Sequence, residues 1–517
     1  MTKKDIAIKS SFIIIFFNLI GRLMGFAREM LVASTFGSNT ATDAYFAAIT
    51  ATGLITALVT VALRTTTIPI LSKAESLEGK AGKISHTNNL LNATIIISSV
   101  LVVVGTVFSP LIVKILAIGF VGEQYELAIL LTRVGMPALL FKAIVGIYRG
   151  YLQSERMFFE SAISDVSLNL VTILYLLFLS IPFGIKGLML ASVISVVSQF
   201  LIQIPSLKKS GYSYEWYLNV KDEYLVKMLH LVPPVLAAVL IDDLNKIVDK
   251  TLASTLIPGS ISALNYATKL ETIIISVFVM SILTVIFPEI SKRFSENNIK
   301  QLSMICSRGF NMIVVITIPA TMWLIVLARP IIEIAFQRGQ FDEIATEMTS
   351  IALVFYSVGL LAVALRVHFN NIYFAMQDTK TPMKNGGLAV ILNLALSVVL
   401  VQFMQHAGLA LATSLSSLLA TILLGYRLRK KVGSVVKRDN ALVIMKSLII
   451  SVLITVIGYL LYYWFLGHLP DGTLSKLISL FSSLLISFSI YIFSLYILRV
   501  SEVELVVNYL KKIIRRA

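Results

Sequence analysis

The sequence contains few of the residues that enzymes use for redox chemistry and metal binding. Its 517 residues include one cysteine, Cys306, and five histidines that lie far apart in the chain. A single cysteine excludes an internal disulfide and a cysteine-rich metal site, so Cys306 is expected to be a small buried apolar side chain. The chain has no HExxH motif and no glycine-rich phosphate loop, and no aspartate pair lies in a sizeable loop. We therefore expect a protein that is not an enzyme.

Charged residues are also scarce, and apolar residues take their place. Only 14% of the residues are charged and 57% are hydrophobic. The mean hydropathy of +0.86 lies outside the range of soluble proteins. Apolar runs of the ~20 residues needed to cross a bilayer recur along the chain and lack the alternation of β-strands. These features predict an all-α polytopic membrane protein with about fourteen transmembrane helices.

The predicted spans are centred near residues 22, 55, 98, 137, 170, 195, 238, 275, 315, 358, 394, 417, 453 and 485. The first run follows three lysines and resembles a signal peptide. However, it is long, contains Arg22 and lacks a small-residue cleavage site. We therefore expect it to remain as the first helix.

Basic residues outside the predicted spans gather in alternate loops. These loops contain Lys73, Lys80 and Lys83; Arg149 and Arg156; Lys208, Lys209 and Lys221; Lys292, Arg293 and Lys300; Lys380 and Lys384; and the segment 427–438. By the positive-inside rule, they and both termini are cytoplasmic. The net charge of +16 is thus a topology signal, and no nucleic-acid partner is expected. In one of these loops, Asp378 followed by Pro382 is typical of a helix start.

The chain partly repeats itself at an offset of 220 residues. Ala33-Ser34-Thr35 matches Ala253-Ser254-Thr255, and Phe46-Ala47 matches Tyr266-Ala267. Six spans per repeat would relate the two halves by an axis along the membrane normal, as in parallel-repeat transporters. We predict an N-terminal lobe over residues 1–210, a C-terminal lobe over 211–432, and a helix pair with a basic tail over 433–517.

Several charges lie inside or beside the predicted spans, where each is costly. Arg22, Arg28 and Glu29 lie in the first span. The others are Asp43, Arg64, Lys142, Asp242, Asp243, Lys246, Asp249, Lys269, Glu271 and Arg366. They could be structural ion pairs, or they could line a central pathway. Since they concentrate on the first two helices of both halves and cations are in surplus, we favour a pathway for an anionic passenger, such as a phosphate.

The first two predicted helices carry GRLMGFARE followed by FGSNTATDAYFAA. Further along the chain come STLIPGSISALNYATKLE, FQRGQFD, FYSVGL and YFAMQDTKTPMK, in this order. These segments resemble the MurJ (MviN) family of lipid II flippases, which belongs to a superfamily of transporters for lipid-linked oligosaccharides, polysaccharides and drugs. The resemblance implies fourteen helices in two lobes of six, a final pair that forms a groove for a polyprenyl tail, and alternating access.

The resemblance also implies roles for individual residues. Arg22, Arg28 and Asp43 match functional charges of the family, whereas Glu29 replaces its aspartate and Lys269 replaces its arginine. We expect Arg22, Arg28, Lys269, Arg64 and Lys142 to bind the diphosphate of the headgroup. We expect Glu29, Asp43, Asp242, Lys246 and Asp249 to act in charge pairing and gating.

One departure from the family lies in the second helix. Where the family usually has an arginine pair, this chain has the uncharged segment Thr56–Ala62. Arg64 or Lys142 could supply the missing charge. A flippase for another undecaprenyl-linked glycan is therefore the alternative to lipid II. A drug or small-cation antiporter is less favoured, because its cavity should be acidic.

The energy source is the least determined feature. Asp243, Asn393 and Thr413 form a weak candidate site for Na⁺. Coupling to the membrane potential or to a proton gradient is an equal possibility. We expect no cofactor, and the partners expected are the undecaprenyl-linked glycan and membrane lipids. The protein is expected to act as a monomer in the bacterial cell membrane.

Overall fold

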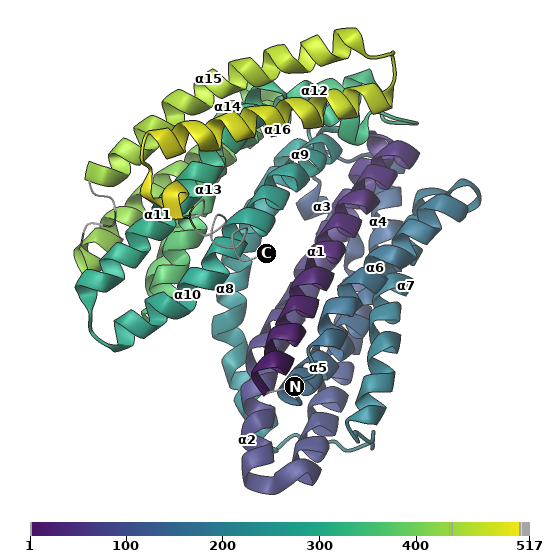
Figure 1. Ribbon diagram of the computed structural model, residues 1–517. Coiled ribbons are helices and arrows are strands. Elements are labelled where there is room, and N and C mark those ends of the chain that lie inside the picture. The colour runs from purple at the N-terminus through teal and green to yellow at the C-terminus, as the bar shows by residue number, and fades with distance from the viewer. Residues whose placement is uncertain (1–2, 434, 436–437, 506–507, 509–517) are drawn as a thin grey trace. The chain divides into compact units, whose positions relative to one another are not determined.

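The computed structural model in Figure 1 describes the backbone of residues 3–433, 435, 438–505 and 508. Side chains are described from residue 16 onward, except those of residues 58, 61–62, 64–66, 161–162, 231–243 and 438. Across this part of the chain the regular structure is helical and no strand occurs. The predicted all-α class is confirmed.

Sixteen α-helices and one π-helical segment follow one another along the chain. They are α1 (Lys3–Phe36), α2 (Thr40–Val107), α3 (Ser109–Leu116), α4 (Gly122–Gly135), α5 (Ala138–Ser154), α6 (Phe159–Phe178), α7 (Ser180–Lys209), α8 (Glu223–Ala253), α9 (Ser260–Ile274), η1 (Ile275–Val279), α10 (Met280–Ser295), α11 (Ile299–Val326), α12 (Ala328–Phe336), α13 (Glu343–Ala375), α14 (Lys380–Val432), α15 (Arg438–His468) and α16 (Thr473–Ile497).

Nine helical segments in the described part of the chain are apolar and long enough to cross a membrane. Two helices are much longer than one crossing needs. The 68 residues of α2 would extend about 100 Å at 1.5 Å per residue, and a bilayer core is about 30 Å thick. However, α2 bends at Gly79, whose φ of 70° lies in the left-handed region that glycine adopts at little cost. The 53-residue α14 bends at Gln405, with φ 51°. The count of fourteen spans stays a prediction.

The described chain falls into two compact units. The first contains α1 to α8, the start of α9 as far as Ser262, and the short segment Gly339–Phe341. The second contains the rest of α9 and the helices that follow, including α15 and α16. The lobe boundaries predicted at residues 210 and 432 stay predictions.

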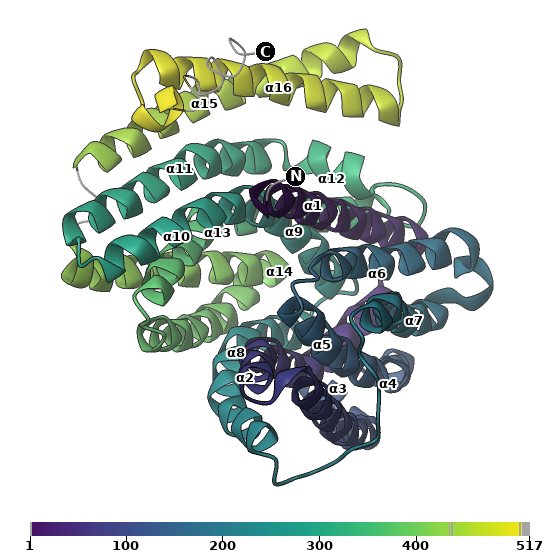
Figure 2. The ribbon, with the colours of Figure 1, turned by 60° about the horizontal axis from the view of Figure 1, so that its bottom comes forward.

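Within the first unit, α2 packs against α4, α5 and α8, and α6 packs against α1 and α7 (Figure 2). The bend at Gly79 divides α2 into a first arm before it and a second arm after it. The core of the unit is formed by fully buried side chains of both arms and of α5, among them Leu71, Leu90, Ile147 and Tyr151. This core fixes α5 against both arms of α2.

Within the second unit, α13 packs against α11 and α14, and α15 lies beside α16. The core draws on α10, α11, α13, α15 and α16. The hydroxyl of Tyr491 on α16 is buried and donates to the carbonyl oxygen of Val315 on α11 at 2.8 Å. The final helix pair is therefore attached to α11 by a specific hydrogen bond as well as by apolar contact.

Candidate functional site

Arg28 on α1 has one neutral and one charged partner. Its Nη1 atom donates to Oδ1 of Asn169 at 3.1 Å, and its Nη2 atom lies 2.8 Å from Oε1 of Glu29. Asn169 on α6 is itself fixed, because its amide nitrogen donates to the carbonyl oxygens of Gly21 and Asp165, each at 3.0 Å. The Arg28 side chain remains 25% exposed, whereas Glu29 is 7% exposed. The guanidinium is thus oriented by α6 and still reachable by a ligand.

Two further predicted diphosphate ligands lie in the same unit. Lys142 on α5 is partly buried and close enough to Arg28 for the two charges to repel each other. Arg22 is exposed, and its spacing of six residues from Arg28 places it about 120° away around the axis of α1. The structure therefore brings Arg28 and Lys142 together and places Arg22 on a different side of α1. The side chain of Arg64 lies outside the described residues, so its role stays a prediction.

Asp43, which was expected to act in gating, caps a helix. Its carboxylate accepts hydrogen bonds from the backbone N–H groups of Gly259 and Ser262, at 2.7 and 2.8 Å, and from the Ser262 hydroxyl at 2.6 Å. These donors belong to the first turn of α9 and the residue before it. Such a carboxylate satisfies N–H groups that have no partner within the helix. Asp43 is 3% exposed and fastens the start of α2 to the start of α9.

The predicted charged stripe of the seventh span lies on α8. In the described part of this helix, Lys246 is exposed and Asp249 is partly buried. The neighbouring Lys250 donates from Nζ to the carbonyl oxygen of Phe46 at 2.7 Å and lies 5.9 Å from the centre of the Phe46 ring. The side chains of Asp242 and Asp243 lie outside the described residues. The gating role of the stripe stays a prediction.

In the second unit, Lys269 on α9 is partly buried. Glu271, two residues later, lies close enough to Arg366 on α13 for the opposite charges to attract. Asn393 and Thr413, proposed from sequence as cation ligands, are neighbours: the Thr413 hydroxyl lies 3.4 Å from Oδ1 of Asn393. Asn393 is fully buried. The structure therefore brings together two of the three predicted Na⁺ ligands.

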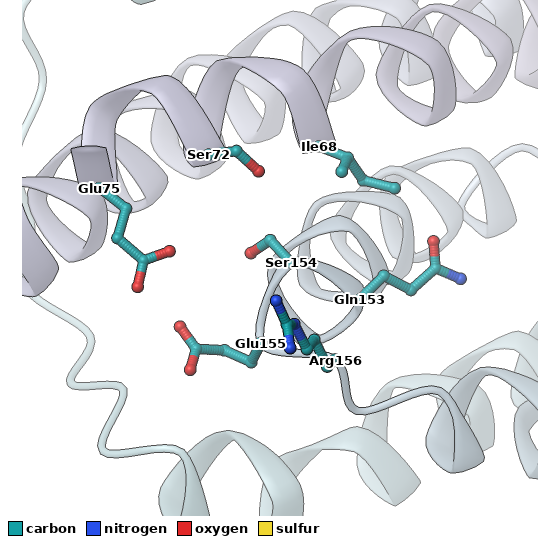
Figure 3. Close-up of a pocket in the computed structure, with 7 residues that line it drawn as sticks. All are labelled: Ile68, Ser72, Glu75, Gln153, Ser154, Glu155 and Arg156. Carbon is teal, nitrogen blue, oxygen red and sulfur yellow. The ribbon is translucent and has the colours of Figure 1, made fainter. Parts of the chain in front are cut away.

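Sequence reasoning missed a buried cation in the first unit. Lys83 in the second arm of α2 is fully buried and forms ion pairs with Glu75 at 2.8 Å and Glu155 at 2.5 Å. Its ammonium group also lies 5.2 Å from the centre of the Tyr151 ring. A neighbouring pocket of about 540 Å³ is lined by Ile68, Ser72, Glu75, Gln153, Ser154, Glu155 and Arg156 (Figure 3). No spacing pattern in the sequence indicates this cluster, because Lys83 and Glu155 are 72 residues apart.

A row of asparagines on α2 binds the segment that joins α7 to α8. The side-chain N–H groups of Asn88, Asn89 and Asn92 donate to the carbonyl oxygens of Ser213, Asn219 and Tyr217, at 3.0, 3.0 and 2.9 Å. Tyr212 in the same segment donates its hydroxyl to Asn88. Burial raises the pKa of Tyr212, which keeps this donor protonated. The segment is therefore held along its length although it has no regular structure.

A family model described as "Lipid II flippase MurJ" matches residues 32–481. The chain belongs to the MurJ family. A relative from Buchnera aphidicola subsp. Schizaphis graminum, named probable lipid II flippase MurJ, is 28% identical over 508 residues, which cover 96% of this chain and 97% of that protein.

Solved structures support the fold of this MurJ-family chain. One, described as lipid II flippase MurJ in an inward closed conformation, superposes with a TM-score of 0.79 at 24% identity and covers 94% of this chain and all of that one. Another, an inward-facing multidrug resistance MATE family transporter of the MOP superfamily, gives a TM-score of 0.68 at 14% identity over 82% of this chain and 98% of that one. The resemblance seen in the sequence motifs is thus confirmed at the level of the family.

Membership of the MurJ family makes this protein a multi-pass membrane transporter. Among the residues predicted for the site, the structure brings together Arg28, Glu29 and Lys142. It adds Asn169, which sequence reasoning missed. The only sequence signal for Asn169 is its position as a lone amide in the middle of an apolar span.

Proposed function

We propose that this MurJ-family protein moves lipid II, the undecaprenyl-diphosphate-linked peptidoglycan precursor, from the cytoplasmic to the outer leaflet of the bacterial cell membrane by alternating access. The family match supports the reaction. The observation that carries the binding mode is the setting of Arg28, because two of its five N–H donors are used within the described chain, by Asn169 and Glu29. The remaining donors are available to a phosphate.

Moving the charged diphosphate headgroup into the middle of the bilayer costs free energy, and fixed cations lower this free-energy cost. Arg28 supplies directed donors, and charge-assisted hydrogen bonds to phosphate are about twice as strong as neutral ones. Glu29 balances the charge of Arg28, whereas Lys142 beside it forms no ion pair in the described part of the chain and so supplies positive charge. We expect Arg22 in this unit and Lys269 in the second to contribute further cations.

The lipid tail need not enter a polar environment. Residues of α15 and α16 expose large apolar side chains, with Leu453 59%, Leu460 61% and Phe481 66% exposed. Such surface is suited to contact with hydrocarbon. We expect the polyprenyl chain to remain along this helix pair while the headgroup crosses.

We propose that both termini are cytoplasmic, that the protein acts as a monomer, and that it needs no cofactor. The distribution of lysine and arginine among the loops supports this orientation. For the energy source, the membrane potential acting on the cations and Na⁺ at Asp243, Asn393 and Thr413 remain the two proposals. The contact between Thr413 and Asn393 supports the second.

A flippase for a different undecaprenyl-linked glycan is the second candidate, favoured by the uncharged segment Thr56–Ala62 in α2. The two candidates share the diphosphate but differ in the sugar and peptide. Rescue of growth in a strain depleted of its own lipid II flippase would support lipid II. Absence of rescue by a protein that is well expressed in the membrane would favour the other glycan.

The diphosphate-binding role is tested by Arg28→Ala. Loss of charge-assisted bonds worth roughly 1.5–3 kcal/mol should lower the rate of headgroup flipping about tenfold or more. Flipping would be measured as accessibility of lipid II at the outer surface of cells. Lys300→Ala, which removes an exposed cation outside the spans, is the control. Unchanged flipping in the Arg28 variant would remove this residue from the binding site.

A further inference from the structure

The interface between α6 and α7 contains a buried polar layer near the start of α6. The two helices are antiparallel neighbours, and their register is set by two hydrogen bonds. The Ser206 hydroxyl donates to Oε1 of Glu160 at 2.6 Å, and the side-chain nitrogen of Gln199 donates to the carbonyl oxygen of Ser164 at 3.2 Å. Gln203 lies one helical turn from both Gln199 and Ser206, on the same face of α7. It therefore projects between the levels of Glu160 and Ser164.

Three side chains in this layer have polar atoms without a partner. Both polar atoms of Gln203, the hydroxyl of Ser164 and Oε2 of Glu160 are buried and form no hydrogen bond within the described residues. Gln203 and Ser164 are fully buried, and Glu160 is 9% exposed. Buried polar atoms are nearly always satisfied, and leaving an amide without any partner is costly. A group of such atoms at one level of two facing helices indicates a bound polar species.

The charges around the layer show what kind of species fits. Arg149 on α5 lies 3.2 Å from Asp165, which also accepts from Gln199 at 3.3 Å. This carboxylate is therefore already balanced, whereas Glu160 forms no ion pair in the described part of the chain. The N-terminus of α6 offers Glu160 only a partial positive charge of roughly one half. A bound cation would balance the remaining negative charge of Glu160.

We propose that Glu160, Ser164 and Gln203 form a binding site for a monovalent cation, with Na⁺ as its occupant. The groups available as ligands are a carboxylate, a hydroxyl and an amide carbonyl, and all three bind a cation through a hard oxygen atom. One carboxylate matches a single positive charge, and no group of three or more His, Cys, Asp or Glu side chains suited to a metal occurs among the described residues. This site is separate from the predicted one at Asp243, Asn393 and Thr413.

The site has a structural connection to the substrate-binding region. Asn169, which orients Arg28, lies on α6 nine residues after Glu160, and Ser198 and Ser167 continue the polar contacts between α6 and α7. A cation held at the start of α6 joins this helix to α7. Its occupancy therefore stabilises the helix on which the orientation of Arg28 depends.

The test uses the purified full-length protein and Na⁺ itself. Thermal unfolding would be followed at equal concentrations of NaCl, KCl and choline chloride, together with binding of radioactive Na⁺. For the unaltered protein we expect a Tm in NaCl that exceeds the value in choline chloride by about 2 °C or more. Glu160→Gln and Gln203→Leu should each abolish this difference and weaken Na⁺ binding about tenfold or more.

Two control variants make the result specific. Gln402→Leu removes an exposed amide on α14 and should keep the Na⁺-dependent difference. Asn393→Ala removes a ligand of the other predicted site, so it shows how much of the Na⁺-dependent difference arises there. If Gln203→Leu does not fold, the nearly isosteric Glu160→Gln decides the question.

Three results would overturn the proposal. They are the absence of any stabilisation by NaCl relative to choline chloride in the unaltered protein, an effect that persists in Glu160→Gln, and an effect lost only in Asn393→Ala. A stabilisation by KCl equal to that by NaCl would support the site but contradict its assignment to Na⁺. Because the readout is cation binding, the outcome is independent of whether the protein flips lipid II.

Discussion

At the scale of single residues, Asp43 shows how one carboxylate can have a structural role in a transporter. It accepts three hydrogen bonds from Gly259 and Ser262, and the Ser262 hydroxyl oxygen also lies 2.9 Å from the Thr42 hydroxyl oxygen. The cap and the predicted gating role require different properties of the residue, because capping needs acceptor atoms and gating needs the charge.

Substitution of Asp43 separates these two roles. Asp43→Ala leaves buried donors of the α9 start without an acceptor and should lower the free energy of unfolding by about 2 kcal/mol, as measured by denaturant unfolding of the purified protein. Asp43→Asn retains one acceptor oxygen and should recover part of this loss. Asp471→Ala, at an exposed carboxylate between α15 and α16, serves as control.

The Asp43→Asn variant also tests gating. If it is nearly as stable as the unaltered protein but does not flip the headgroup, the charge of Asp43 acts in transport. If Asp43→Ala is as stable as the Asp471→Ala control, the capping role assigned to Asp43 is wrong.

At the scale of elements, the two ends of α14 meet at one residue. Asp378, which precedes the helix, accepts from the backbone N–H of Thr381 at 3.0 Å and from its hydroxyl at 2.7 Å. It also pairs with Lys431 in the last turn of the same helix. A straight 53-residue helix would hold these ends about 80 Å apart, so the bend at Gln405 makes α14 a hairpin. The helix start predicted at Asp378 is confirmed.

This contact predicts a pH-dependent contribution to stability. Burial alone would raise the pKa of Asp378, but the hydrogen bonds from Lys431 and Thr381 outweigh it and lower the pKa to about 2. Because this lies below the usual value of 3.8, the contribution is complete above about pH 4 and is lost as the pH falls through 2. Asp378→Asn should therefore destabilise the protein near neutral pH.

The expected loss is at most about 1 kcal/mol, since Lys431 is exposed to solvent. Unfolding would be compared between the variant and the unaltered protein at neutral pH and below pH 4, where their difference should shrink. Asp471→Asn should show no such difference at either pH. A gap between Asp378→Asn and the unaltered protein that is constant across this range would contradict the role of the carboxylate.

The elements also show what sequence patterns could and could not predict. Apolar runs predicted the helical class, and the motif around Arg28 predicted the family. Asn169 and Lys83 were not recognised, because Arg28 and Glu155, with which they interact, lie on other helices and leave no periodic trace in the sequence. The hairpin in α14 was predicted as two spans near residues 394 and 417. Its bend has a left-handed backbone at Gln405, and Gly408 packs closely against the carbonyl oxygen of Leu400.

At the scale of the whole molecule, the orientation in the membrane follows from charge alone. The loops with many lysines and arginines should face the cytoplasm, because translocating them across the membrane is unfavourable. The part of α2 that follows its bend at Gly79, which includes Ser85, should then be cytoplasmic. The turn at Asp471 should be outside. If the true number of spans between Ser85 and Asp471 differed from the predicted number by an odd number, both positions would lie on the same side of the membrane.

The single cysteine makes this prediction directly testable. Cys306 is fully buried, so the unaltered protein should react little with a membrane-impermeant maleimide. Asp471→Cys should be labelled in intact cells, whereas Ser85→Cys should be labelled only after the membrane is permeabilised, since both positions are exposed. Labelling of Ser85→Cys in intact cells together with protection of Asp471→Cys would show an inverted orientation. Labelling of both in intact cells would show that the count of spans between them is wrong by an odd number, and the proposed direction of headgroup transport would need a new basis.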